Sequence, residues 1–163
     1  MSAIAWLQQL TECYSQRMEK DFRVLMGCCF AVIAALLVVG SVSHGVIRHI
    51  VQTSPLWIAI VLSVRRSLWS KWAALPCFAF WLLLMVAIWL FLLGWARIVS
   101  GSFSPTEIAM TVIVGVASIL GILRAVGIRS GVQAWSATAM VLLVTVLQVV
   151  AFRISLLPAI AHR

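Results

Sequence analysis

The sequence predicts an all-α polytopic membrane protein, in which a bundle of five transmembrane helices is preceded by an amphipathic interfacial helix. The first observation is composition, because 64% of the 163 residues are apolar and the mean hydropathy is +1.13. The second is a set of long apolar runs at residues 24–42, 73–96, 108–123 and 134–152, with a shorter run at 56–64. About 20 apolar helical residues cross a bilayer core, and the core offers no water to an unpaired backbone group. Runs of this kind therefore predict membrane-spanning helices.

Five spans and their connections account for nearly the whole chain. We expect an N-terminal helix over residues 1–22 and one helical bundle over residues 23–163. No signal-peptidase cleavage pattern follows the first apolar run, so we expect it to remain as the first span. A net charge of +8 would suit nucleic-acid binding in a soluble protein. Here the basic residues flank the spans, where they meet lipid headgroups. The partners we expect are membrane lipids and other membrane-protein subunits, and no nucleic acid.

Residues 3–20 have the pattern of an amphipathic helix. Apolar and aromatic side chains recur at helical spacing on one face, and they are Trp6, Leu7, Leu10, Cys13, Tyr14 and Met18. We expect this helix to lie flat at the cytoplasmic surface of the membrane. The alternative is a docking face for a partner helix, with Trp6, Leu10 and Tyr14 as the candidate residues.

The second span has the weakest apolar signal. As a helix, residues 56–64 cover about 14 Å, roughly half of a bilayer core. The preceding Gln52, Thr53, Ser54 and Pro55 look like a helix break and restart, with Ser54 as N-cap and Pro55 in the first turn. We expect this segment to cross the membrane. A bundle of four spans with a short or re-entrant second segment is the alternative.

The distribution of Lys and Arg favours five spans. In that arrangement eight basic residues lie on the N-terminal side of the membrane, namely Arg17, Lys20, Arg23, Arg65, Arg66, Lys71, Arg124 and Arg129. Four lie on the other side, namely Arg48, Arg97, Arg153 and Arg163. Four spans would divide them six to six. The positive-inside rule therefore predicts a cytoplasmic N-terminus and a C-terminus outside, and we expect a bacterial inner (plasma) membrane.

Four polar residues at the predicted outer face form the candidate polar or lipid-headgroup site: His44, Arg48, His49 and Glu107. His44 and Arg48 are one turn apart if the first helix continues this far. His44 and His49 are about 140° apart around a helix, so they share no metal-binding face. Snorkelling at a helix end explains the basic side chains, and binding of an anionic headgroup or substrate is the alternative. Glu107 completes a capping-box pattern with Ser104, and proton or cation handling is its alternative role.

Small residues in the fourth span form a candidate helix-packing seam, namely Gly115, Ala117 and Gly121. Residues of this size let two helices approach closely, and we expect the seam to lie inside the bundle. In the third span, Trp81, Met85 and Trp89 share one helical face. The sequence leaves open whether this stripe meets lipid, protein or a hydrophobic cofactor.

No pattern in the chain indicates an active site. The four cysteines form no CxxC pair, and no P-loop, HExxH or EF-hand sequence occurs. The spans carry no central charge of the kind that marks transport pathways. We therefore expect no catalytic residue, no cofactor and no metal site. The predicted function is that of a non-catalytic accessory subunit or scaffold in a larger membrane complex. A small transporter or lipid-handling protein that uses the outer-face site is the alternative.

Overall fold

The computed structural model describes residues 3–96, 103–128, 131–157 and 160; before residue 18, some side chains are not described. These residues form five helices, α1 (Ala3–Val42), α2 (Val46–Val64), α3 (Ser70–Leu92), α4 (Pro105–Gly127) and α5 (Ala134–Ser155). No strand occurs within these ranges. Each helix is long and apolar enough to cross a membrane, in α1 through the part Met18–Val42. The predicted all-helical bundle with five spans is confirmed.

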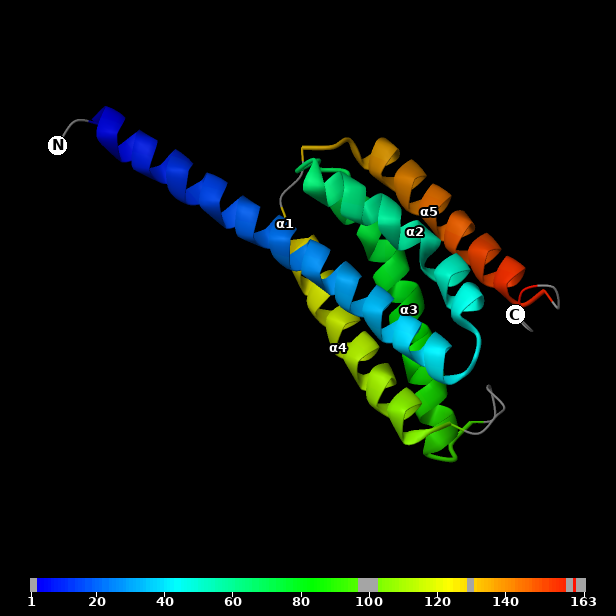
Figure 1. Cartoon of the computed structure of the whole chain (residues 1–163). Coiled ribbons are helices and arrows are strands. Elements are labelled where there is room, and N and C mark those ends of the chain that lie inside the picture. The colour runs from blue at the N-terminus through cyan, green and yellow to red at the C-terminus, as the bar shows by residue number, and fades with distance from the viewer. Residues whose placement is uncertain (1–2, 97–102, 129–130, 158–159, 161–163) are drawn as a thin grey trace.

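Successive helices run in opposite directions, and they pack side by side (Figure 1). α1 packs against α2 and α4, whereas α3 packs against α2, α4 and α5. α5 contacts α2 and α3 among the described helices. We call the end from which α1 projects the extension end; it holds the ends of α2 and α4 and the starts of α3 and α5. The opposite end is the hairpin end, after the turn between α1 and α2.

The core lies around α3. Phe78 is fully buried, Trp81 is 1% exposed and Met85 is 5% exposed. Leu25 of α1 and Val114 of α4 are among the side chains that complete the same apolar cluster. Burying large side chains of this kind away from the lipid gives the helices extensive van der Waals contact, which drives association inside a bilayer. The aromatic stripe on α3 therefore meets protein at its first two positions.

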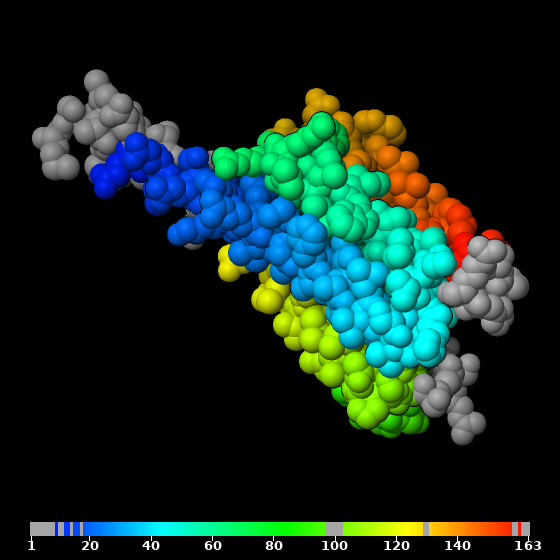
Figure 2. All heavy atoms as spheres, viewed as in Figure 1, coloured from blue at the N-terminus to red at the C-terminus, as the bar shows by residue number. Residues whose placement is uncertain are grey.

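α1 continues without a break from the N-terminal segment into the first span. The segment is helical, as expected, and it is continuous with the first span rather than a separate helix. Residues 3–17 add about 22 Å of helix beyond the span, and Figures 1 and 2 show this part standing clear of the other helices. We call residues 3–17 the α1 extension. No proline interrupts α1, and Glu19 bonds to Arg23 one turn later, so nothing local ends the helix at the membrane surface.

α2 is one helix, so the break and restart expected at residues 52–55 is wrong. Pro55 lies inside the helix and lacks the backbone N–H that would bond to the carbonyl of Val51. The hydroxyl of Ser54 donates to that carbonyl at 2.8 Å instead. A polar side chain thus replaces the missing backbone bond, and the helix crosses the proline.

The carbonyls beside that position also accept side-chain hydrogen bonds. The Thr53 hydroxyl donates to the carbonyls of His49 and Ile50, at 3.0 and 3.1 Å. From α5, Nε2 of Gln148 donates to the carbonyl of Gln52 at 3.1 Å. Side-chain donors of this kind let a transmembrane helix contain a proline without leaving backbone groups unpaired. The polar residues that resemble a loop in the sequence are therefore what keeps α2 helical.

Candidate functional site

The turn at the hairpin end separates the candidate residues that the sequence placed on one helix. α1 ends at Val42, and His44 adopts a left-handed backbone conformation with φ +55°. The N–H of Gly45 donates to the carbonyl of Gly40 at 2.8 Å, which closes the turn before α2 begins. His44 therefore lies in the turn while Arg48 lies on α2. Because α1 does not continue through these residues, His44 and Arg48 do not lie one turn apart on a single helix.

His49 is held inside this turn. Its Nδ1 lies 3.0 Å from the carbonyl oxygen of Gly45, one turn earlier. A Cβ atom on Gly40 would lie 3.0 Å from the same ring nitrogen and 3.0 Å from the Cα of Val46. α1 and α2 thus approach closely at this glycine, and His49 is half-buried against that contact. Its imidazole is part of the packing of the hairpin.

Arg48 is the one residue of the candidate site with an unmet bonding capacity inside the protein. It is half-buried, and its Nε is buried with no hydrogen-bond partner among the described residues. A buried donor of a charged group that lacks an acceptor is costly. Arg48 could therefore bind an acceptor, such as a carboxylate or phosphate oxygen, at this end of the bundle.

Glu107 forms the predicted capping box, which is confirmed. Its Oε2 accepts from the N–H of Ser104 at 2.7 Å, and its own N–H donates to Oγ of Ser104 at 3.2 Å. Pro105 occupies the first turn of α4, where its missing N–H costs nothing. The carboxylate is close enough to His49 to act on it electrostatically, but its hydrogen bond closes its own helix. His49 and Glu107 thus have structural roles, whereas His44 is exposed in the turn.

The candidate packing seam on α4 divides into two parts. Gly121 faces Phe78 of α3, and a Cβ there would lie 2.7 Å from Cδ2 of that ring. Ala117 is 6% exposed. Gly115 has nothing within 4 Å of the position where its Cβ would stand. Gly121 therefore leaves room for the ring of Phe78, while Gly115 makes no close contact within the described chain.

The candidate docking face lies on the α1 extension. The backbone at Trp6, Leu10 and Tyr14 is helical, but the side chains of these three residues lie outside the described part of the structure. On the polar face, the described Gln9, Glu12, Ser15 and Gln16 are exposed, and so is Cys13, which the sequence pattern placed on the apolar face. The helical backbone preserves the spacing on which the face depends.

Ion pairs at the extension end connect helices in a way that the sequence did not predict. Glu19 accepts from Arg66 at 3.0 Å, which joins α1 to the turn after α2. Asp21 pairs with Arg124 of α4 at 3.4 Å. The sequence separations are 47 and 103 residues, so no local pattern could reveal them. The one available signal was the isolation of two carboxylates within a strongly basic chain.

Buried polar contacts tie together other parts of the bundle. Nζ of Lys71, which is 7% exposed, donates to the carbonyl of Ile128 at 2.7 Å, after the end of α4. Gln52 of α2 donates to Oγ of Ser155 on α5 at 2.9 Å. The side-chain amide of Gln148 on α5 also has a partner inside the bundle, the carbonyl of Gln52. Each bond satisfies groups that lipid cannot.

No cluster of three or more His, Cys, Asp or Glu side chains suited to a metal ion occurs among the described residues. The three buried cysteines, at positions 28, 29 and 77, are free thiols in the apolar interior. No family model, curated protein or solved structure matches the chain. The function must therefore be argued from the bundle itself.

Proposed function

We propose that this protein is a non-catalytic subunit or scaffold of a larger membrane complex, and that it binds its partner through the α1 extension. The observation that supports this is the length of α1, which runs from Ala3 to Val42 while its span begins at Met18. Short isolated helices are marginal in water because nucleation is costly. A helix that projects beyond its bundle with an apolar face is stabilised when another surface covers that face.

Two ion pairs lie at the base of the extension and connect α1 to the turn after α2 and to α4. Glu19 is held by Arg66, and Asp21 by Arg124, directly below the projecting segment. An element that is held in one direction before binding loses less conformational entropy when it docks. The same contacts stabilise α1 at the point where it continues beyond the bundle into water.

The decisive experiment is purification in a mild detergent with matched variants of the two faces. Leu10→Glu with Tyr14→Glu places two carboxylates on the apolar face. Gln9→Glu with Gln16→Glu makes the same change of charge on the opposite face. We expect a stoichiometric heterologous partner to remain with the second variant and to be lost from the first. Equal retention by both variants would refute docking through this face.

The proposed location is a bacterial inner membrane, with the N-terminus in the cytoplasm. The support is the eight-to-four division of Lys and Arg between the two sides, which follows from five spans. An odd number of spans puts the termini on opposite sides. Reporter fusions after Arg163 are expected to indicate the outer compartment, and a cytoplasmic signal there would reverse the proposed orientation.

The second candidate function is lipid handling or transport at the hairpin end, and it is favoured by the unpartnered Nε of Arg48. The two candidates predict different purified species. A scaffold is isolated with a second protein, whereas a lipid-handling protein is isolated as a homogeneous homo-oligomer with bound lipid. In the second case, Arg48→Gln is expected to reduce the co-purified lipid, whereas the scaffold should keep its partner after the same change.

A further inference from the structure

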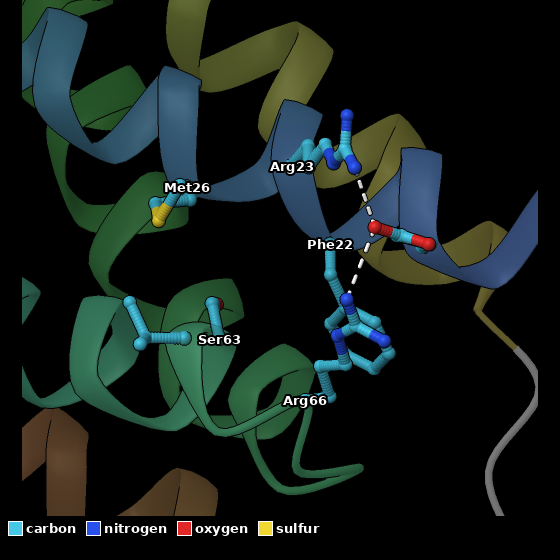
Figure 3. A pocket seen from close by; sticks show the side chains of 7 residues that line it. Phe22, Arg23, Met26, Ser63 and Arg66 are labelled. Atoms are coloured by element: carbon cyan, nitrogen blue, oxygen red, sulfur yellow. Dashed lines mark hydrogen bonds and ion pairs between the residues drawn. The ribbon is translucent and has the colours of Figure 1, made fainter.

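A pocket of about 200 Å³ opens at the extension end, between α1 and the end of α2. Figure 3 shows Phe22, Arg23 and Met26 on the α1 side and Ser63 and Arg66 on the α2 side. The lining is completed by Glu19 and Val64. Charged side chains form one part of this lining and apolar side chains the other. This combination matches the boundary between headgroups and acyl chains of a bilayer.

The charged part of the pocket has more donors than the protein uses. Glu19 accepts hydrogen bonds from Arg23 and Arg66 through the same oxygen, Oε1. The side chains of the two arginines are 71% and 67% exposed. A guanidinium carries five N–H donors, and one carboxylate leaves this group with a net charge of +1. Donors of both arginines therefore remain available to a second anion.

A further donor lies deeper in the pocket. Ser63 is 3% exposed, and its hydroxyl has no hydrogen-bond partner among the described residues. A serine in a helix ordinarily bonds back to a carbonyl of the preceding turn, as Ser54 does in α2. An unpaired hydroxyl in an apolar surrounding is unfavourable. An oxygen that reached this depth would relieve it.

The backbone at Arg66 has a conformation that disfavours any side chain. Arg66 has φ +51° and closes α2, with its N–H donating to the carbonyl of Ser63 and that of Ser67 donating to Leu62, both at 2.9 Å. Glycine is the usual residue at this position of a helix end, because a Cβ is disfavoured there. Gly94 occupies the equivalent position after α3, with φ +75°.

We propose that this pocket binds the phosphate group of an anionic membrane phospholipid. Phosphate oxygens accept from Arg23 and Arg66, and an ester or glycerol oxygen accepts from the Ser63 hydroxyl. Phe22, Met26 and Val64 contact the first carbons of an acyl chain. Arginine pairs with phosphate through charge-assisted bonds, and headgroups lie at the ends of spans. This site does not depend on docking by the α1 extension.

The test is a titration of the delipidated protein, in a neutral detergent, with phosphatidylglycerol, read by native mass spectrometry. Arg66→Gln is expected to weaken binding about fivefold, since one basic residue at a lipid surface contributes on this scale. The matched control is Arg65→Gln, which removes the same charge from the adjacent exposed residue outside the pocket. Equal weakening by both changes would overturn the proposal in favour of unspecific surface attraction.

A second pair of variants separates binding from folding. Glu19→Gln breaks the same ion pair as Arg66→Gln, but it frees both guanidinium groups. We expect it to tighten binding of phosphatidylglycerol, whereas weaker binding by both variants would show that the ion pair acts through the fold. Ser63→Ala is expected to weaken binding, and Ser118→Ala, at a buried serine of α4 that also has no partner, is expected to leave it unchanged.

Two further ligands identify the source of the phosphate. Phosphatidylcholine carries the phosphate with a compensating positive charge, and we expect weaker binding than for phosphatidylglycerol. Inorganic phosphate lacks the glycerol and acyl groups that Ser63 and Phe22 would contact, and we expect it to compete poorly. Competition by inorganic phosphate at equal concentration would replace the lipid site with a site for a free anion.

Discussion

At the extension end, Glu19 and Asp21 connect α1 to the turn after α2 and to α4, whereas at the hairpin end Glu107 closes the first turn of its own helix. The chain has four acidic residues against twelve basic ones, so each carboxylate has many possible partners. Two that are described pair across helices, at the end where α1 leaves the bundle. The extension end is therefore held partly by charge.

The hairpin end is held by close contact of backbones. Gly40 of α1 lies against Val46 and His49 of α2, where a Cβ would make unusually tight contacts. Contact of this kind depends on shape and is insensitive to salt, while exposed ion pairs are screened. The extension end should therefore respond to salt, and the hairpin end to the size of the side chains at its contact.

The largest effect is expected from Gly40→Ala. The new Cβ would lie 3.0 Å from Cα of Val46, an unusually tight contact that requires α1 and α2 to shift by a few tenths of an ångström, and overpacking of this kind costs about 1–3 kcal/mol. The control is Gly27→Ala on the same helix, where nothing lies within 4 Å. That change should stabilise by about 0.5–1 kcal/mol through helix propensity. Unfolding in mixed micelles measures both free energies, and a similar loss for both would contradict the role of the close contact.

A smaller effect on stability is expected at His44 and Arg66, the two turn residues with a left-handed backbone conformation. His44→Gly should stabilise the protein by about 0.5–1 kcal/mol, because glycine removes the strain of a positive φ. The greater conformational entropy that glycine gives the unfolded chain cancels part of this stabilisation. Arg66→Gly relieves the same strain but loses the ion pair with Glu19. Its gain should therefore be smaller at low salt and approach that of His44→Gly at high salt. Equal gains at both salt concentrations would show that the ion pair contributes nothing.

The sequence was sufficient where the structure depends on short-range patterns. The apolar runs predict the spans because length and hydropathy are local properties. The capping box at Ser104 and Glu107 is predictable because its two bonds join residues three apart. The candidate seam at Gly121 follows from residue size, although its partner, Phe78, does not.

The sequence was insufficient where a distant residue decides the outcome. Pro55 and its polar neighbours indicate a break, and their side chains instead satisfy the carbonyls of α2 with help from Gln148 of α5. Whether that help exists depends on how the bundle packs. The same holds for the ion pair between Glu19 and Arg66.

Within the hairpin end, Glu107→Gln tests whether the carboxylate acts by shape or by charge. Glutamine also accepts the N–H bond of a capping box, so only the favourable interaction with the helix dipole is lost, about 0.3–1 kcal/mol. We expect fold and assembly to remain intact. Glu107→Ala removes both the capping hydrogen bond and the charge, so it should lower the free energy of unfolding further. If Glu107→Gln abolished a measured transport activity while the fold persisted, the capping role would not be sufficient and the transporter alternative would gain support.

The smallest effect is expected from the pair between Asp21 and Arg124, and a double-mutant cycle isolates it. The two atoms are 3.4 Å apart, and the side chains are 18% and 54% exposed, so their coupling should be about 0.2–1 kcal/mol. Asp21→Asn and Arg124→Gln, alone and together, yield this value from unfolding in mixed micelles. A parallel cycle with Glu107→Gln and Arg48→Gln at the hairpin end should give additive effects, since no ion pair joins those residues in the part of the chain that is described. Raising the salt concentration should reduce the first coupling and leave the second at zero, because the first is a partly exposed charge pair. Coupling of the same size in both cycles would show that charge holds the two ends alike.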